Sequence, residues 1–263
     1  MTRFVRCLVD GEPSYGVIEG HEVALIEPHP FATYRPTGTR LPVAGLRLLA
    51  PVIPSKIVAV GRNYADHAAE LGNDVPAEPL LFLKPSTAVI GPDDPIRLPT
   101  DLSEDVHYEG EIAVVIGALV ARVSPEVAQK AILGVTCAND VTLRDVQQWE
   151  DQWVRAKGFD GSCPLGPAIT TGLDLTDLRV RTFVDGELRQ DGHSSTMIHD
   201  IAHVVAAISQ VMTLLPGDVV LTGSPAGVGA LRPGQRVRVE IEGVGSLENP
   251  VVDRNAETQG TRH

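Results

Sequence analysis

Two glutamates one residue apart are the side chains in this sequence best placed for chemistry. Glu109 and Glu111 flank Gly110 at the start of an apolar run that continues to Ile116. In a β-strand, side chains at i and i+2 point to the same face, so the two carboxylates are expected to project together. Like charges this close repel each other unless a cation or a proton shares the space. The spacing therefore predicts a bound metal ion, and the alternative is a pair of surface carboxylates at a strand end.

A third carboxylate belongs to Asp140, which follows a short apolar stretch at 132–135 and precedes a helix-capping sequence at 142–145. A turn between a strand and a helix is a common place for a functional side chain. Ligands that are all oxygen favour Mg²⁺ or Mn²⁺ over zinc, and Ca²⁺ is a third ion that they accept. Glu109, Glu111 and Asp140 are therefore the predicted metal ligands.

A lysine and a histidine–glutamate pair could act beside such a metal. Lys157 stands next to Gly158 and Phe159, and in a pocket it could stabilise an oxyanion, whereas the alternative is a solvated lysine. His67 and Glu70 are three residues apart on a predicted short helix, so they share a face. A carboxylate that orients an imidazole makes a general base, and the alternative is an exposed helical pair.

The glycine-rich segment 222–229 follows a predicted strand at 219–221. It lacks the lysine of a P-loop, so nucleotide binding is disfavoured. Its backbone N–H groups and its hydroxyl are instead expected to contact a small anionic ligand, and the alternative is a tight turn that binds nothing.

The surrounding segments predict a β-rich α+β protein. Strands are expected at 4–9, 15–18, 56–60, 80–83 and 236–241, with a hairpin at 180–187. Helices are expected after Ser124, over 146–153 and over 201–212. Because helices and strands do not alternate regularly, a doubly wound sheet is disfavoured. We expect a small N-terminal β-rich domain at 1–50 with a proline-rich irregular linker over 27–42, a catalytic domain at 51–252 and a disordered polar tail at 253–263.

Composition limits the classes of partner. The chain has 263 residues and a formal net charge of -12, which argues against nucleic acid and membrane surfaces as partners. Its three cysteines form no CxxC motif, which is typical of a reducing compartment. The N-terminus has no apolar signal segment, and no apolar run is long enough to span a bilayer. A cytoplasmic enzyme is therefore expected.

Several short segments between 56 and 251 form a more specific pattern. They are 61–67 (GRNYADH), 82–85 (FLKP), 108–111 (YEGE), 138–140 (AND), 157–160 (KGFD), 163–167 (CPLGP), 216–218 (PGD) and 222–229 (TGSPAGVG). Together and in this order they resemble the fumarylacetoacetate hydrolase (FAH) family. The resemblance implies a β-roll of mixed sheets with few flanking helices, a homodimer, and small 2-oxo or 2,4-diketo acid substrates handled with Mg²⁺ or Mn²⁺.

The resemblance also implies roles for individual residues. It implies Glu109, Glu111 and Asp140 as metal ligands, Lys157 as the active-site lysine, and His67 with Glu70 as a catalytic dyad on a lid. The substrate contacts that it implies are Arg62, Tyr64, Arg144, Gln147, Gly223 and Ser224. Two departures from the family pattern reshape the expected pocket: Ser224 replaces a threonine, and Leu143 stands where a small residue is usual.

The leading functional hypothesis is metal-dependent hydrolysis of a C–C bond in an acylpyruvate-like or 2,4-diketo acid, through an enolate that the metal stabilises. The alternative is isomerisation or decarboxylation of a 2-oxo acid of the oxaloacetate or 2-hydroxyhepta-2,4-diene-1,7-dioate type, as in aromatic catabolism. A lesser alternative is a metal-binding scaffold without turnover, against which the presence of both the dyad and the lysine argues.

Overall fold

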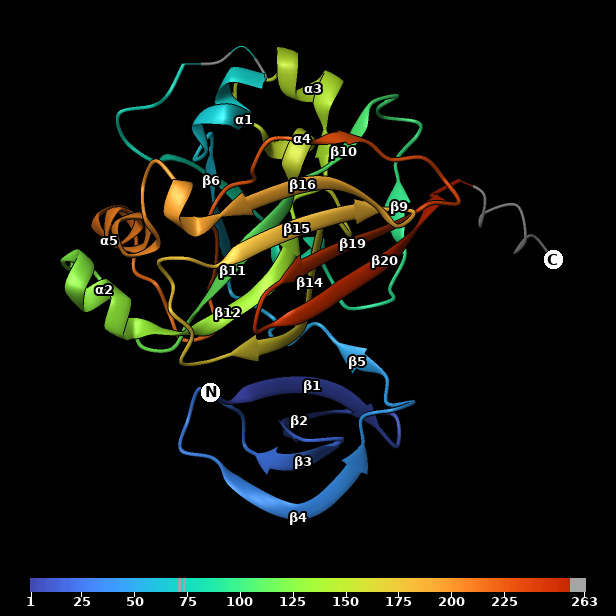
Figure 1. Ribbon diagram of the computed structural model, residues 1–263, viewed down its shortest axis with the longest axis vertical. Helices are drawn as coiled ribbons and strands as arrows, with labels where there is room; N and C mark the ends of the chain where they lie inside the picture. Colours follow the sequence, from blue (N-terminus) through green and yellow to red (C-terminus); the bar gives the residue numbers. More distant parts are fainter. Residues whose placement is uncertain (71, 73, 256–263) are drawn as a thin grey trace.

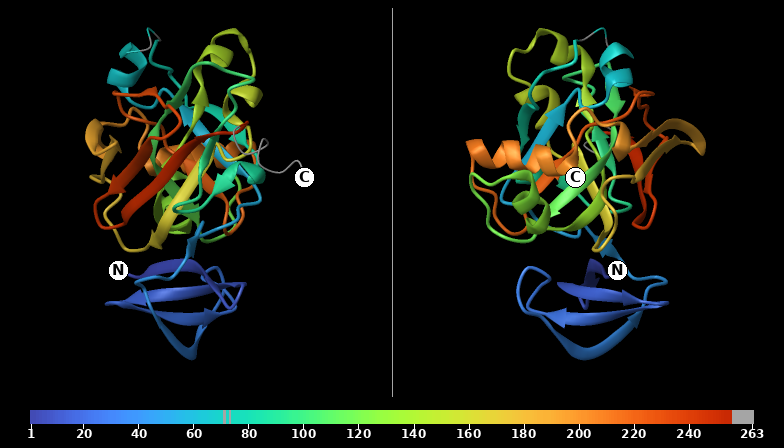
Figure 2. Two further views of the ribbon diagram at one scale, coloured as in Figure 1. Left: turned by 90° about the vertical axis from the view of Figure 1, so that its right-hand side faces the viewer. Right: turned by 60° about the vertical axis from the view of Figure 1, so that its left-hand side comes forward.

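The computed structural model describes residues 1–255 except residues 71 and 73. Figure 1 shows a large sheet-rich body with few helices and a smaller β unit at one end, and Figure 2 shows the same separation from two other sides. The sheet-rich fold class predicted from the sequence is confirmed. No helix among the described residues has the length and apolar character needed to cross a membrane.

The smaller unit is an antiparallel meander. Its strands are β1 (Arg3–Val9), β2 (Glu12–Glu19), β3 (Glu22–Glu27), β4 (Arg35–Pro42) and the short β5 (Leu48–Leu49). Strand β4 contradicts the irregular linker expected over 27–42. It is almost wholly exposed and is held by its ladder with β3, so it shows no apolar periodicity from which a strand could be predicted.

The body is built on a sheet in which β1 is followed by β14, β12, β11, β17, β6 and β7. The bounds of these strands are β6 (Ile57–Gly61), β7 (Leu80–Lys84), β11 (Gly110–Ile116), β12 (Ile132–Asn139), β14 (Cys163–Thr170) and β17 (Val219–Leu221), and β8 (Val89–Ile90) pairs with β14. Every residue of β11 is buried, which explains its continuous apolar sequence. This strand places the predicted metal ligands in the interior.

Two further sheets complete the body. One has the order β16 (Glu187–His193), β15 (Arg179–Val184), β19 (Arg236–Ile241), β20 (Gly245–Asp253) and β9 (Ile96–Leu98). The other joins β13 (Thr142–Leu143), β10 (Val106–Tyr108) and β18 (Gly229–Ala230). Apolar residues of β11 and β12 pack against residues of β15 and β19 in one core. The predicted hairpin at 180–187 is confirmed as β15 and β16.

The helices are short. They are α1 (Ala65–Glu70), α2 (Pro125–Ala131), α3 (Arg144–Trp149), α4 (Val154–Lys157) and α5 (Ile201–Val211), with 3-10 turns η1 (Ser86–Ala88) and η2 (Ser194–Thr196). The helix expected over 146–153 has different bounds, because α3 begins after Leu143 and ends at Trp149. Thr142 does not cap it, since its hydroxyl donates to the carbonyl oxygen of Asp140 at 2.8 Å.

The segment expected to be a disordered tail starts within ordered structure. Asp253 is the last residue of β20, and the backbone N–H of Arg254 donates to the carbonyl oxygen of Leu98 at 3.1 Å. Residues 256–263 lie outside the described residues.

Candidate active site

Three buried carboxylates converge where β11 begins and β12 ends. Glu111 is the second residue of β11, Glu109 immediately precedes that strand, and Asp140 immediately follows β12. The backbone N–H of Asp140 donates to the carbonyl oxygen of Glu109 at 2.8 Å, which holds the two strand ends together. One oxygen from each carboxylate lies within 4.8 Å of the others. Three hard oxygen donors this close fit a divalent cation such as Mg²⁺ or Mn²⁺.

Gly110 is required between the two glutamates by packing. A Cβ atom there would lie 1.9 Å from the hydroxyl oxygen of Thr182 on β15. Its backbone N–H donates to the side-chain oxygen of Gln190 on β16 at 2.9 Å. The face opposite the carboxylates therefore rests directly on the second sheet.

Buried cations surround two of the three carboxylates. The ammonium nitrogen of Lys157 lies 2.8 Å from Glu109 and 2.6 Å from Asp140, and Arg144 donates to the other oxygen of Glu109. Lys84 donates to the other oxygen of Asp140 at 2.6 Å. Within the described part of the chain, Glu111 contacts no cation and accepts only the backbone N–H of Gly223, at 2.7 Å. The site is therefore charged asymmetrically.

The pKa shifts follow this asymmetry. Burial, followed by the negative charges of Asp140 and Glu109, raises the pKa of Glu111 well above its usual range. Burial acts in the same direction on Glu109, but Lys157 and Arg144 outweigh it and lower the pKa of that carboxyl. Burial would lower the pKa of Lys157, and the charges of Asp140 and Glu109 overcome it and raise that pKa. An ionised Glu111 needs a further positive charge, which a bound metal would supply.

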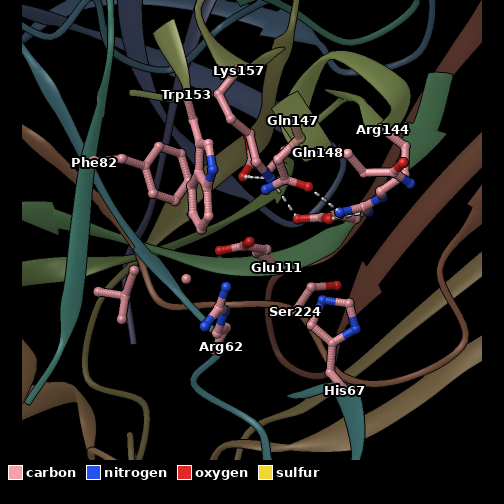
Figure 3. Close-up of a pocket in the computed structure, with 14 residues that line it drawn as sticks. Arg62, His67, Phe82, Glu111, Arg144, Gln147, Gln148, Trp153, Lys157 and Ser224 are labelled. Atoms are coloured by element: carbon pink, nitrogen blue, oxygen red, sulfur yellow. Dashed lines mark hydrogen bonds and ion pairs between the residues drawn. The ribbon is translucent and has the colours of Figure 1, made fainter. Parts of the chain in front are cut away.

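The triad opens into a cavity of about 330 Å³. Figure 3 shows Phe82 and Trp153 on one wall, His67 and Ser224 on the other, and Arg62 on the side of Glu111 away from Lys157. The two aromatic rings are edge-on, with centroids 5.5 Å apart. The cavity thus combines an apolar wall with several fixed polar groups, as small-molecule sites usually do.

The histidine–glutamate pair lies at the same cavity. Nδ1 of His67 is 3.1 Å from a carboxylate oxygen of Glu70, and the imidazole lines the cavity although its residue is only 5 % exposed. Glu70 also accepts the backbone N–H of Gly227 at 3.1 Å, which fixes α1 against the glycine-rich loop. The carboxylate selects the tautomer with the proton on Nδ1, so Nε2 is the basic nitrogen.

Four of the six residues predicted to contact the substrate lie at the cavity surface. Arg62, Arg144, Gln147 and Ser224 line the cavity. Gly223 does not line the cavity, but its backbone N–H donates to Glu111, which does. Tyr64 is not among the residues that line this cavity, and its contact with substrate stays a prediction. Asn63 donates to the carbonyl oxygens of Thr222 and His199. The backbone of Tyr64 forms a β-bridge with Met197, and its ring lies near Gly192 on β16.

Two N–H groups of the glycine-rich loop are engaged within the protein, and the expected contact of this loop with an anionic ligand stays a prediction. Its N–H groups at Gly223 and Gly227 donate to the protein carboxylates Glu111 and Glu70. Sequence reasoning also missed Phe82 and Lys84 as parts of the site. The signal was the i, i+2 spacing of these two residues on a short strand, which places both side chains on one face.

Comparison with known proteins gives consistent matches. A family model described as "Fumarylacetoacetate (FAA) hydrolase C-terminal" matches residues 56–252, and one described as "Rv2993c-like, N-terminal" matches residues 2–51. Protein Rv2993c of Mycobacterium tuberculosis is 53% identical to this chain, and the match covers 92% of this chain and 90% of Rv2993c. Oxaloacetate tautomerase YisK of Bacillus subtilis is 38% identical to this chain, and the match covers 78% of this chain and 73% of YisK.

A solved structure extends the likeness to three dimensions. The crystal structure of 2-hydroxyhepta-2,4-diene-1,7-dioate isomerase from Mycobacterium marinum superposes with a TM-score of 0.90 at 46% identity, covering 97% of this chain and 99% of that one. The β-roll implied by the resemblance is thereby confirmed. The tautomerase and isomerase among these similar proteins support the second reaction considered from the sequence better than C–C bond hydrolysis.

Proposed function

Since the chain belongs to the fumarylacetoacetate hydrolase family, we propose that it is an enzyme that interconverts the keto and enol forms of a 2-oxo dicarboxylic acid. The observation that supports this most directly is that one cavity contains both the acidic triad and the imidazole of His67. Tautomerisation needs one group that polarises a carbonyl and one that moves a proton at the neighbouring carbon. The cavity contains candidates for both.

Each group has a definite part in the proposed reaction. Glu109, Glu111 and Asp140 would hold a divalent metal, preferably Mg²⁺ or Mn²⁺, which when bound supplies Lewis acidity at the 2-oxo group. His67, held by Glu70, takes a proton from the carbon next to the carbonyl through Nε2. Lys157 places its positive charge beside the oxygen on which negative charge develops. The proton then returns to that oxygen, and no bond between heavy atoms breaks.

The charges of the cavity favour a substrate with two carboxylates. Lys84, Lys157 and Arg144 are each engaged by Glu109 or Asp140. Arg62 lines the cavity and has no acidic partner among the described residues. Once a divalent cation is bound, the cavity has a net positive charge that suits a dianion. We assign the distal carboxylate of the substrate to Arg62.

An assay with oxaloacetate tests the proposal. The ultraviolet absorbance of the enol follows its conversion when protein is added with Mg²⁺ or Mn²⁺, and NMR in D₂O records deuterium at C3 and any fragments. We expect the protein to speed the interconversion of keto and enol forms, and a chelator to abolish this effect. We also expect no more breakdown of oxaloacetate than occurs without the protein. Equal rates with and without the protein would refute the proposal.

C–C bond hydrolysis is the second candidate. The matched family model is named for a hydrolase, and an oriented imidazole can activate water as well as deprotonate carbon. The same NMR experiment with an acylpyruvate distinguishes the two, because hydrolysis releases pyruvate and a second acid. Homodimerisation and a cytoplasmic location stay predictions of the sequence analysis.

A further inference from the structure

Lys84, the last residue of β7, is the least expected side chain near the metal centre. It is 1 % exposed, and it is the largest of the side chains that are fully buried. A lysine loses the hydration of its ammonium group on burial, so it is found in the interior almost only when it is paired. Lys84 does not line the cavity, and the proposed reaction assigns it no step.

Two acceptors hold this ammonium group in place. It donates to Oδ1 of Asp140 at 2.6 Å and to the backbone carbonyl oxygen of Lys157. The hydroxyl of Ser162 donates to the same carbonyl at 2.8 Å, so the end of α4 is fixed from two directions. Close packing supports this arrangement, since a Cβ atom on Gly158 would lie 2.6 Å from the carbonyl oxygen of Val154 and 3.3 Å from Pro85.

The two oxygens of Asp140 therefore have different partners. Oδ1 faces Lys84, and Oδ2 faces Lys157 at 2.6 Å, on the cavity side. A carboxylate that is free to rotate could present either oxygen to the centre, or lie between the two orientations. A fixed donor behind it removes that freedom, and ligands held by outer hydrogen bonds bind metal more tightly.

We propose that Lys84 is a positioning residue of the metal centre, which fixes the rotation of the Asp140 carboxylate and joins this ligand to the segment that bears Lys157. The inference concerns the metal site that the proposed function uses, and it does not depend on which 2-oxo acid reacts. It also gives a reason for a fully buried lysine at the edge of the central sheet.

The test measures the binding of Mn²⁺ alone to the full-length, metal-free protein by titration calorimetry. Lys84→Met removes the ammonium group and keeps most of the side-chain volume. The matched control is Lys56→Met, because Lys56 also pairs with a buried aspartate, but that aspartate, Asp218, is not one of the three carboxylates of the metal centre. We expect Lys84→Met to weaken Mn²⁺ binding about 10- to 100-fold, the usual effect of removing an outer partner of a metal ligand. The Mn²⁺ affinity of Lys56→Met should stay within about twofold of wild type, because Lys56 supports no proposed metal ligand.

Thermal unfolding of the metal-free variants separates positioning from general support of the fold. Equal Mn²⁺ affinity in wild type and a folded Lys84→Met variant overturns the proposal. If Lys84→Met does not fold, Lys84→Gln decides, because its uncharged amide keeps a polar group in this position but is one bond too short to keep the hydrogen bond to Asp140. Mn²⁺ binding to Lys84→Gln as tight as to wild type would then refute the inference. Normal Mn²⁺ binding without tautomerase activity in the wild type would instead refute only the proposed function.

Discussion

Glu109 and Glu111 are two residues apart, but their replacement by glutamine should change the stability of the metal-free protein in opposite directions. Glu111 is buried beside Asp140 and Glu109, and its pKa is raised by burial and by those charges. Glu109 is paired with Lys157 and Arg144, and its pKa is lowered although burial opposes this. Glu111→Gln therefore removes the cost of a buried charge that is repelled by two neighbouring carboxylates. Glu109→Gln instead removes the carboxylate that pairs with both Lys157 and Arg144.

The magnitude follows from proton linkage. A carboxyl with a raised folded-state pKa binds more protons in the folded than in the unfolded protein, so its contribution to stability falls as pH rises from its ordinary value of 4.5 toward the raised value. The limiting slope for one proton is about 1.4 kcal/mol per pH unit. For each pH unit above 4.5, the free energy of unfolding of Glu111→Gln should therefore rise relative to wild type by up to about 1.4 kcal/mol. This corresponds to about 3–6 °C in the unfolding midpoint. Glu109→Gln should lose about 3–5 kcal/mol, the usual cost of breaking a buried ion pair.

Calorimetric unfolding of wild type and both variants in EDTA at pH 5, 6, 7 and 8 measures these differences. The advantage of Glu111→Gln should be smallest at pH 5 and should widen with pH. Mn²⁺ at 100 times its dissociation constant stabilises wild type by about 2.7 kcal/mol, and the variant has lost a ligand. Added Mn²⁺ should therefore reduce the advantage of Glu111→Gln at every pH and reverse the order at pH 5 and 6, where the limiting advantage is below about 2.7 kcal/mol. A Glu111→Gln protein that is less stable than wild type in EDTA at pH 8, or one that keeps the full Mn²⁺ stabilisation, would contradict the charge distribution described here.

Three further substitutions probe the cavity. His67→Asn should lower kcat for oxaloacetate by about 10²- to 10⁴-fold while calorimetric Mn²⁺ affinity stays unchanged, and an unchanged rate would point to another base. Arg62→Met should weaken inhibition by a dicarboxylate analogue about 10- to 150-fold, the value of one charged hydrogen bond, and barely affect a monocarboxylate; equal losses for both would remove its assigned role. Tyr64→Phe should leave kcat and KM unchanged and should not lower the unfolding temperature, because the buried hydroxyl has no partner among the described atoms. A large fall in kcat would instead support the substrate contact of Tyr64 that the family resemblance implies.

The acidic half of the site could be predicted from the sequence because its residues stand in a conspicuous context. Two carboxylates beside a fully buried strand are unusual, and the third follows the strand that pairs with it. The helical spacing of His67 and Glu70 predicted that their side chains would meet, and in the structure Nδ1 of His67 lies 3.1 Å from a carboxylate oxygen of Glu70. These inferences needed only short-range periodicity and the alternation of side chains along a strand.

The basic half could be predicted only in part from local patterns. Lys84 ends an ordinary apolar strand, and nothing in its neighbours indicates that it meets Asp140, which is 56 residues away in the sequence. Strand β4 was missed for a related reason, since its stability comes from backbone pairing and not from apolar burial. Contacts between distant segments depend on how the sheets curve and pack, which single-strand periodicity does not encode.

The glycine-rich loop connects the two halves of the proposed chemistry. Gly223 has φ of 96° and donates its N–H to Glu111, and Gly227 has φ of 100° and donates to Glu70, which orients His67. Neither position accepts a side chain, because a Cβ atom at Gly227 would lie 2.0 Å from the carbonyl oxygen of Arg189, and one at Gly223 would lie 2.7 Å from Asn63. Left-handed backbone and close packing therefore explain the glycines at these two positions. One loop therefore holds both Glu111, a proposed metal ligand, and Glu70, which supports the proposed base, so the fold itself sets the distance between the acidic cluster and the imidazole.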